Sequence, residues 1–251
     1  MDYQATFKRY EVKYMLTRAQ KYAILETMKP YMELDKYGRT TIRNIYFDTE
    51  NYRLIRHSLE SPTYKEKLRL RSYKKAGPED PSFVELKKKY RSVVYKRRLE
   101  LSAGEATLCL LHGSPLPVHS QIANEIEYFR NYYGDLRPAM FISYEREAFY
   151  SDDGSDFRVT FDENILCRQD DFSLASDAYG LSLLEDGMTL MEIKTSGGYP
   201  LWMSHELNRL GIFKTSFSKY GSAYRHMFEE HSLSTTPINT IKVTTGGRLY
   251  A

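Results

Sequence analysis

The chain has 251 residues, of which 41% are hydrophobic and 27% charged, a composition ordinary for a globular protein that buries one sizeable core. Its formal net charge of +3 is too small to indicate nucleic-acid binding by bulk electrostatics, because positive charge matters there chiefly as a concentrated patch. Such a patch exists between residues 64 and 101, where thirteen Lys and Arg residues stand against five Asp and Glu residues, so the remainder of the chain is net acidic.

Strands and helices are both predicted in the first half of the chain. Thr17 is a suitable N-cap for the first helix, in which Ala23, Ile24 and Met28 recur at helical spacing. A cluster of Lys, Gly and Pro residues at 74–81 predicts a hairpin loop. The elements expected here are strands at 6–16, 40–48, 65–73, 83–89 and 93–101 and helices at 17–34 and 51–59.

The second half shows the same mixture of elements. Ser102 and Glu105 have the spacing of a capping box and predict a helix start, and Gly and Pro residues at 113–117 interrupt this helix. The stretch at 232–251 is rich in Ser, Thr and Gly and is expected to be a flexible tail. The other elements expected are helices at 121–133, 201–210 and 219–229 and strands at 139–150, 157–163 and 189–195.

Charged and apolar residues alternate along several of these strands, as in Lys67-Leu68-Arg69-Leu70-Arg71 and Glu192-Ile193-Lys194. Alternate side chains of a strand point to opposite faces, so the charged residues gather on one face of a sheet. Such a face commonly meets water, and this interpretation stays open. About eight strands in an α+β pattern can instead close into an antiparallel barrel. Its charged tunnel would then hold counter-charges, water or an anionic ligand, and phosphate chains are the obvious candidates.

Nine short segments occur in order, each on a predicted strand or strand edge: Glu11-Val12-Lys13-Tyr14, Ile45-Tyr46-Phe47-Asp48-Thr49, Leu68-Arg69-Leu70-Arg71, Val84-Glu85-Leu86-Lys87, Tyr95-Lys96-Arg97-Arg98, Tyr144-Glu145-Arg146, Arg158-Val159-Thr160-Phe161-Asp162, Met191-Glu192-Ile193-Lys194 and Phe217-Ser218-Lys219-Tyr220. In this order they resemble the polyphosphate-polymerase (VTC) domain, a branch of the CYTH-like triphosphate tunnel metalloenzymes, from about Phe7 to about Arg225. The resemblance implies one tunnel domain over residues 1–231, built as a closed antiparallel barrel with helices packed on the outside.

The resemblance also implies roles for individual residues. Glu192 would hold a divalent metal, Mn²⁺ or Mg²⁺, with Glu85 or Glu11 nearby, and Tyr144 and Ser218 would donate hydroxyl hydrogen bonds to the substrate. The phosphate-binding cations of the catalytic tunnel would be Lys13, Arg69, Arg71, Lys87, Lys96, Arg98, Arg146, Arg158, Lys194 and Lys219.

One departure from the family pattern affects the predicted chemistry. The wider superfamily opens with Glu-x-Glu-x-Lys, whereas this chain has Arg9-Tyr10-Glu11-Val12-Lys13, so only the second carboxylate is present. With one carboxylate fewer, a two-metal hydrolase is less expected than a one-metal transferase or a binding protein.

Three functions remain open at this stage. The leading hypothesis is a polyphosphate polymerase that transfers the γ-phosphoryl group of ATP to a growing polyphosphate chain. The alternatives are a triphosphatase acting on inorganic or nucleoside triphosphate, and a non-catalytic polyphosphate- or nucleic-acid-binding module. The expected partners are a nucleoside triphosphate and polyphosphate. Nucleic acid is not expected, because the basic strands contain few of the Phe and Trp residues on which single strands stack.

Cysteine usage and hydropathy bear on the compartment. Cys109 and Cys167 form no CxxC pair, so neither a disulfide framework nor a zinc knuckle is indicated, and a reducing compartment is the simpler interpretation. No apolar run reaches the length of a signal peptide or a membrane span. A cytoplasmic location is therefore expected, with any membrane partner being a separate protein.

Overall fold

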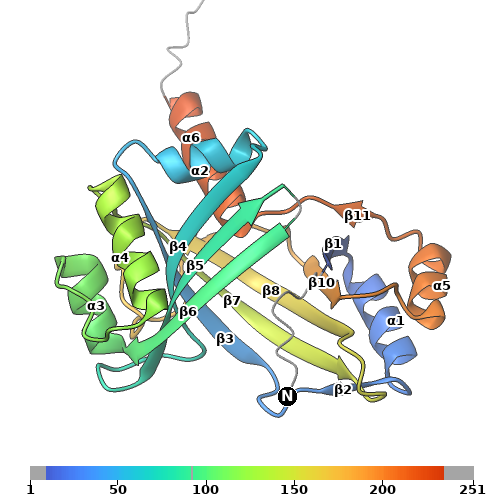
Figure 1. Ribbon diagram of the computed structural model, residues 1–251. Coiled ribbons are helices and arrows are strands. Elements are labelled where there is room, and N and C mark those ends of the chain that lie inside the picture. Colours follow the sequence, from blue (N-terminus) through green and yellow to red (C-terminus); the bar gives the residue numbers. More distant parts are fainter. Residues whose placement is uncertain (1–9, 92, 235–251) are drawn as a thin grey trace, which may run out of the picture.

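The computed structural model describes residues 10–91 and 93–234, which form eleven strands and six helices (Figure 1). The helices are α1 (Arg18–Met28), α2 (Arg53–Leu59), α3 (Ala103–His112), α4 (Gln121–Tyr133), α5 (Leu201–Arg209) and α6 (Lys219–Ser234). The strands are β1 (Tyr10–Leu16), β2 (Met32–Leu34), β3 (Thr40–Asp48), β4 (Tyr64–Ser72), β5 (Pro81–Tyr90), β6 (Val93–Ser102), β7 (Arg137–Ser151), β8 (Arg158–Arg168), β9 (Leu181–Ser182), β10 (Thr189–Thr195) and β11 (Lys214–Thr215).

All the strands belong to one antiparallel sheet, which confirms the predicted α+β class. Its order is β11-β1-β10-β8-β7-β3-β4-β5-β6, with β2 added to β7 and β9 added to β8. Eight of the strands have seven or more residues, the number expected from the sequence. The other three are two- or three-residue strands that show no alternation, and the sequence did not predict them.

The predicted closed barrel is not confirmed. Among the described residues the path of pairings ends at β6 and at β11, and no pairing joins these two ends. The physical reason is that β11 pairs with β1 at Lys13 and Tyr14. The short strand therefore occupies part of the β1 edge that β6 would need in order to close the sheet.

Two apolar clusters pack helices against the face of the sheet opposite its Lys and Arg residues: the first joins β3, β4, β5 and β6 to α3 and α4, and the second joins β1, β8 and β10 to α1 and α5 (Figure 1). A third cluster joins β3, β7 and β8 to α2 and α6 and lies on the charged face, because its Tyr46 pairs with Arg69 across β3 and β4. Leu70 and Val84 are fully buried in the first cluster, and truncating such a side chain to Ala typically costs about 2–5 kcal/mol. Because strand residues alternate, burying the apolar face against helices leaves the charged residues on the opposite face.

Local signals fix several boundaries. The predicted N-cap Thr17 accepts a hydrogen bond from the backbone N–H of Gln20, and Ser102 and Glu105 form the predicted capping box. The first helix ends at Met28 and not at Leu34 as predicted, because Pro30 has no N–H and breaks the helical hydrogen-bond pattern. The chain after Pro30 instead pairs with β7 as β2.

The two ends of the chain lie partly outside the described residues. Residues 6–9 of the predicted first strand are not described, and helix α6 continues to Ser234. The helix therefore includes residues 232–234, which were predicted to begin the flexible tail, and residues 235–251 of that predicted tail lie outside the described part. No helix in the described part of the chain is both long enough and apolar enough to cross a membrane.

Candidate functional site

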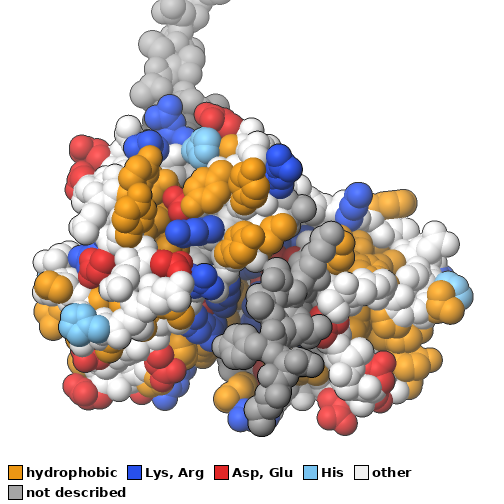
Figure 2. Space-filling view, in the orientation of Figure 1, with side chains coloured by type: hydrophobic (Ala, Val, Ile, Leu, Met, Phe, Trp, Pro, Cys, Tyr) orange, Lys and Arg blue, Asp and Glu red, His pale blue; other side chains and the backbone are white. Residues whose placement is uncertain are grey.

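A cavity of about 360 Å³ lies on the charged face of the sheet, and all eight long strands contribute side chains to its lining. Figure 2 shows Lys and Arg side chains in the hollow at the centre of this face. We call this cavity the tunnel cavity. Its charged lining residues are Glu11, Lys13, Lys67, Arg69, Arg71, Glu85, Lys87, Lys96, Arg146, Arg158, Glu192, Lys194 and Lys219.

The structure brings together fourteen of the fifteen residues that the sequence analysis selected, including Tyr144 and Ser218. The exception is Arg98, which does not line the cavity. Its guanidinium donates to Glu85 Oε1 and to the hydroxyl of Tyr73 at 2.6 Å. Arg98 therefore contacts Glu85 without lining the cavity. The roles assigned to all these residues remain predictions.

Glu85 is the anionic centre of one half of the cavity. It is 1% exposed and lies 2.6 Å from Arg69, 2.5 Å from Arg98, 2.8 Å from Lys96 and 3.9 Å from Arg71. Burial alone would raise the pKa of Glu85, but Arg69, Arg71 and Lys96 outweigh it and hold the pKa far below its usual value. Both carboxylate oxygens already accept from cations, so this geometry favours positioning of the guanidinium groups over metal binding.

Glu192 is the anionic centre of the other half. Its oxygens lie 3.3 Å from Arg146, Lys194 and Lys219 and 3.5 Å from Lys13. These contacts are longer than those of Glu85. Burial would raise the pKa of Glu192, but Lys219, Lys194, Lys13 and Arg146 together hold it well below its usual value. The carboxylate is thus ionised and less tightly held than that of Glu85.

The sequence model of the VTC domain family matches residues 8–228, which is most of the chain. This chain belongs to the VTC domain family. A search of curated protein sequences gives no significant match.

Solved structures that match this chain include proteins from Hippeastrum, Bacillus halodurans and Pyrococcus horikoshii. A Hippeastrum protein, first assigned as an adenylyl cyclase and reported to have a dominant triphosphatase activity, matches with a TM-score of 0.52 and 16% identity over 86% of this chain and 95% of that one. A provisionally assigned adenylate cyclase from Bacillus halodurans matches with a TM-score of 0.44 and 14% identity over 94% and 96% of the two chains. A Pyrococcus horikoshii protein matches with a TM-score of 0.45 and 14% identity over 88% and 99%. At 16% identity, the Hippeastrum match supports the fold of this VTC domain alone.

Asp162 of this VTC domain does not line the tunnel cavity, but it contacts two residues that do, and the sequence analysis did not select it. Its carboxylate is fully buried and accepts from Arg146 Nε at 2.5 Å and from Lys219 Nζ at 2.5 Å. Burial would raise the pKa of Asp162, but Arg146 and Lys219 lower it below its usual value. The signal was present in the sequence, because Arg158, Thr160 and Asp162 share one face of β8.

Lys67 was also missed, although it shares a strand face with the selected residues Arg69 and Arg71. Its ammonium group donates a hydrogen bond to Ser218 Oγ at 3.2 Å, and no carboxylate lies within ion-pair distance of it in the described part of the chain. Burial lowers the pKa of Lys67 to about 8. Lys67 is therefore a cation that an anionic ligand would stabilise.

The segment entering α6 positions three of these side chains. Lys13 Nζ donates to the carbonyl of Phe217 at 2.8 Å, and Ser218 Oγ accepts from Lys67 and from the backbone N–H of Gly221. A side chain at Gly221 would lie 3.2 Å from Ser218 Oγ. A glycine at this position leaves room for Ser218 beside the tunnel cavity.

Glu11 and Glu192 fit a divalent cation better than Glu85 does. Glu11 faces Lys194 across the β1–β10 pair while Glu192 faces Lys13, so the two carboxylates lie on adjacent strands and share the same two lysines. Mg²⁺ and Mn²⁺ take hard oxygen ligands, and Mg²⁺ is usually held by one or two carboxylates plus substrate phosphates. No group of three or more His, Cys, Asp or Glu suited to a metal occurs among residues 10–91 and 93–234, so the substrate would have to complete the coordination.

Proposed function

We propose that this VTC domain transfers the γ-phosphoryl group of ATP to the end of a polyphosphate chain lying in the tunnel cavity. The observation that carries the proposal is the charge of the lining, in which ten Lys and Arg side chains face three carboxylates. A lining with so large an excess of cations suits a polyanion, since buried cations are costly without counter-charge.

Three cations mark the path proposed for the phosphates. Lys67, Lys87 and Arg158 line the cavity, and in the described chain none of them has a carboxylate within ion-pair distance. The buried Nε of Arg158 has no hydrogen-bond partner there. A buried donor without a partner is costly, and phosphate oxygens would supply the missing acceptors.

The paired cations would stabilise the transition state without rearranging. Arg146 and Lys219 are fixed by Asp162, and Arg69 is fixed by Glu85. Phosphoryl transfer depends mainly on positioning and on neutralising charge on the transferred group. Glu11 and Glu192 would hold Mn²⁺ or Mg²⁺, which when bound neutralises further phosphate charge.

The protonation states favour transfer to a phosphate over transfer to water. A chain-end phosphate oxygen is already ionised and needs no general base, whereas an attacking water benefits from one. Asp162, Glu85 and Glu192 are all held below their usual pKa and paired with cations, so they are weak bases. A triphosphatase remains the second candidate, because the Hippeastrum protein of similar fold is reported to have a dominant triphosphatase activity.

The test is an incubation of the full chain with ATP and Mn²⁺, followed by a gel stained for polyphosphate and an assay of free phosphate. The proposal expects a ladder of chains that Glu192→Gln abolishes and that Glu33→Gln, a change on strand β2 at the surface, leaves intact. Free phosphate without a ladder would instead establish the triphosphatase. Tight polyphosphate binding without either product would leave a binding module.

A further inference from the structure

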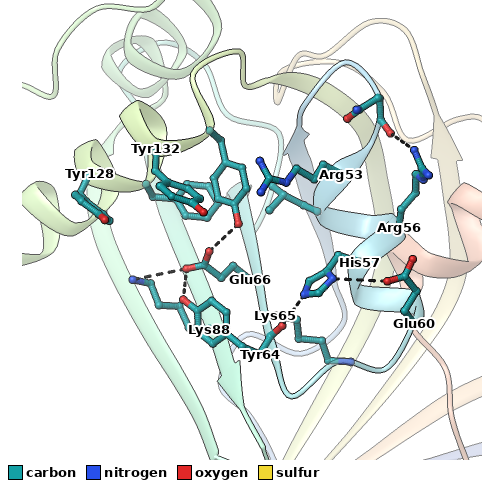
Figure 3. Close-up of a pocket in the computed structure, with 14 residues that line it drawn as sticks. Arg53, Arg56, His57, Glu60, Tyr64, Lys65, Glu66, Lys88, Tyr128 and Tyr132 are labelled. Carbon is teal, nitrogen blue, oxygen red and sulfur yellow. Dashed lines mark hydrogen bonds and ion pairs between the residues drawn. The ribbon is translucent and has the colours of Figure 1, made fainter.

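A second and larger cavity, of about 550 Å³, lies between α2 and α4 at the ends of β4 and β5 (Figure 3). We call it the outer cavity. Its β4 residues Tyr64 and Glu66 alternate with the tunnel residues Lys67 and Arg69 and so face away from the tunnel cavity, whereas Lys65 reaches the outer cavity from the end of the strand. Among the described residues the two cavities share no lining residue. The outer cavity is therefore a separate site.

One wall of the outer cavity is aromatic. Tyr128 and Tyr132 are one helical turn apart on α4, with ring centroids 6.4 Å apart and planes inclined by 20°, and Tyr132 meets Tyr133 edge to face at 5.0 Å. Tyr128 is 69% exposed and Tyr132 is 60% exposed. Large exposed ring surfaces beside a cavity offer a stacking face for a planar ligand.

The facing wall is cationic. Arg53 of α2 lies over the ring of Tyr133 at 5.4 Å, and the neighbouring cations Arg56 and Lys65 donate hydrogen bonds to backbone carbonyls at 3.4–3.5 Å. Figure 3 shows Arg53 on the side of the cavity that faces the tyrosines of α4. Within the described chain, no carboxylate lies within ion-pair distance of these three cations. Their charges are available to an anion.

Glu66, the more buried of the two carboxylates that line the cavity, already has hydrogen-bond partners. Glu66 is 9% exposed and accepts from the hydroxyls of Tyr64 and Tyr133, and Lys88 lies 3.8 Å from it. The other carboxylate, Glu60, lies 3.7 Å from His57. The cavity thus has an excess of positive charge and does not suit an organic cation, although aromatic residues alone would.

We infer that the outer cavity binds a nucleotide, with the base against the rings of Tyr132 and Tyr128 and the phosphate against Arg53 and its neighbouring cations. The cavity volume is within the range of small-ligand sites. A bare phosphate chain would leave the aromatic wall unused, and an uncharged aromatic ligand would leave the cations unused. This site is independent of the proposed chemistry in the tunnel cavity.

The test measures AMP binding to the full chain by calorimetry, because a monophosphate offers little to the tunnel cavity. AMP is expected to bind at least tenfold more tightly than adenosine or ribose 5-phosphate. Tyr132→Ala and Arg53→Gln should each weaken AMP binding about tenfold, since stacking of a base on an aromatic ring contributes about 1–3 kcal/mol. Both side chains are exposed, and unchanged urea midpoints would show that the variants fold.

Two controls locate the binding. Tyr22→Ala removes a tyrosine that is 63% exposed on the distant helix α1 and should bind AMP as the unmodified chain does. Lys87→Gln removes a cation of the tunnel cavity without breaking an ion pair seen in the described residues, and it should not weaken AMP binding. Loss of AMP binding in Lys87→Gln with an unchanged urea midpoint would place the nucleotide in the tunnel and overturn the inference. Absence of AMP binding, unchanged binding in Tyr132→Ala and Arg53→Gln, or equal binding of ribose 5-phosphate would overturn it as well.

Discussion

Lys219 Nζ donates to Asp162 Oδ2 at 2.5 Å, and this contact joins the first residue of α6 to the middle of β8. The same carboxylate accepts from both Nε and Nη2 of Arg146 on β7. One buried acid therefore fixes two tunnel cations that come from different parts of the chain. The arrangement makes Asp162 a positioning residue for Arg146 and Lys219.

Replacing Asp162 by Asn should destabilise the fold and impair the tunnel chemistry together. Removing one partner of a buried ion pair typically costs about 3–5 kcal/mol, because the other charge is left uncompensated. Urea unfolding measures this loss, and the matched control is Asp153→Asn, which alters an exposed loop. An unfolding free energy equal to that of the control would show that Arg146 and Lys219 do not depend on Asp162.

Glu85→Gln and Glu192→Gln should separate positioning from metal binding. In the presence of tripolyphosphate, Mn²⁺ affinity measured by electron paramagnetic resonance should fall at least tenfold in Glu192→Gln. Glu85→Gln should retain Mn²⁺ affinity, because both oxygens of Glu85 are already engaged by Arg69 and Arg98. A larger loss of Mn²⁺ affinity in Glu85→Gln than in Glu192→Gln would indicate that Glu85 binds the metal.

Strand parity is the part of the site that the sequence could predict. A period of two is a property of a strand by itself, so Arg69, Arg71, Lys87, Lys194 and their neighbours could be placed on one face without knowing the fold. Pairings between these side chains could not be predicted in this way. Asp162 meets Arg146 because of the register between β7 and β8, which depends on tertiary structure.

Neither the open edge of the sheet nor the outer cavity could be predicted from local sequence patterns. Strand β11 has two residues, too few for any periodicity, yet it takes part of the edge of β1. The outer cavity depends on how α2 and α4 pack beside β4, and no motif in either helix indicates it. The structure assigns it because Tyr132 and Arg53 are brought to facing walls.

Acid should weaken the fold through Glu85, Glu192 and Asp162. Their pKa values in the folded chain lie below the ordinary values of 4.5 for Glu and 3.8 for Asp. The unfolded chain therefore binds more protons in this range, so the stability they contribute is complete above about pH 5 and is lost as the pH falls toward the folded values. Urea midpoints measured from pH 7 to pH 3 should decline, and less steeply in Glu85→Gln than in Glu185→Gln, a surface control. Equal declines in the two variants would contradict the role given to Glu85.

Lys67 should make phosphate binding depend on pH near 8. Its pKa is about 8 in the ligand-free chain because burial disfavours the charged ammonium, and a bound phosphate would raise that pKa by supplying a counter-charge. Binding therefore takes up a proton above pH 8, and the affinity for tripolyphosphate should fall as the pH rises from 7.5 to 9.5. Lys67→Arg keeps a permanent positive charge at this position, so the affinity of this variant for tripolyphosphate should fall less. Ionisation of the ligand affects both chains equally and therefore cancels when their pH profiles are compared. Calorimetry in two buffers of different ionisation enthalpy measures the proton uptake. Identical pH profiles for the two chains would show that Lys67 does not contact the phosphate.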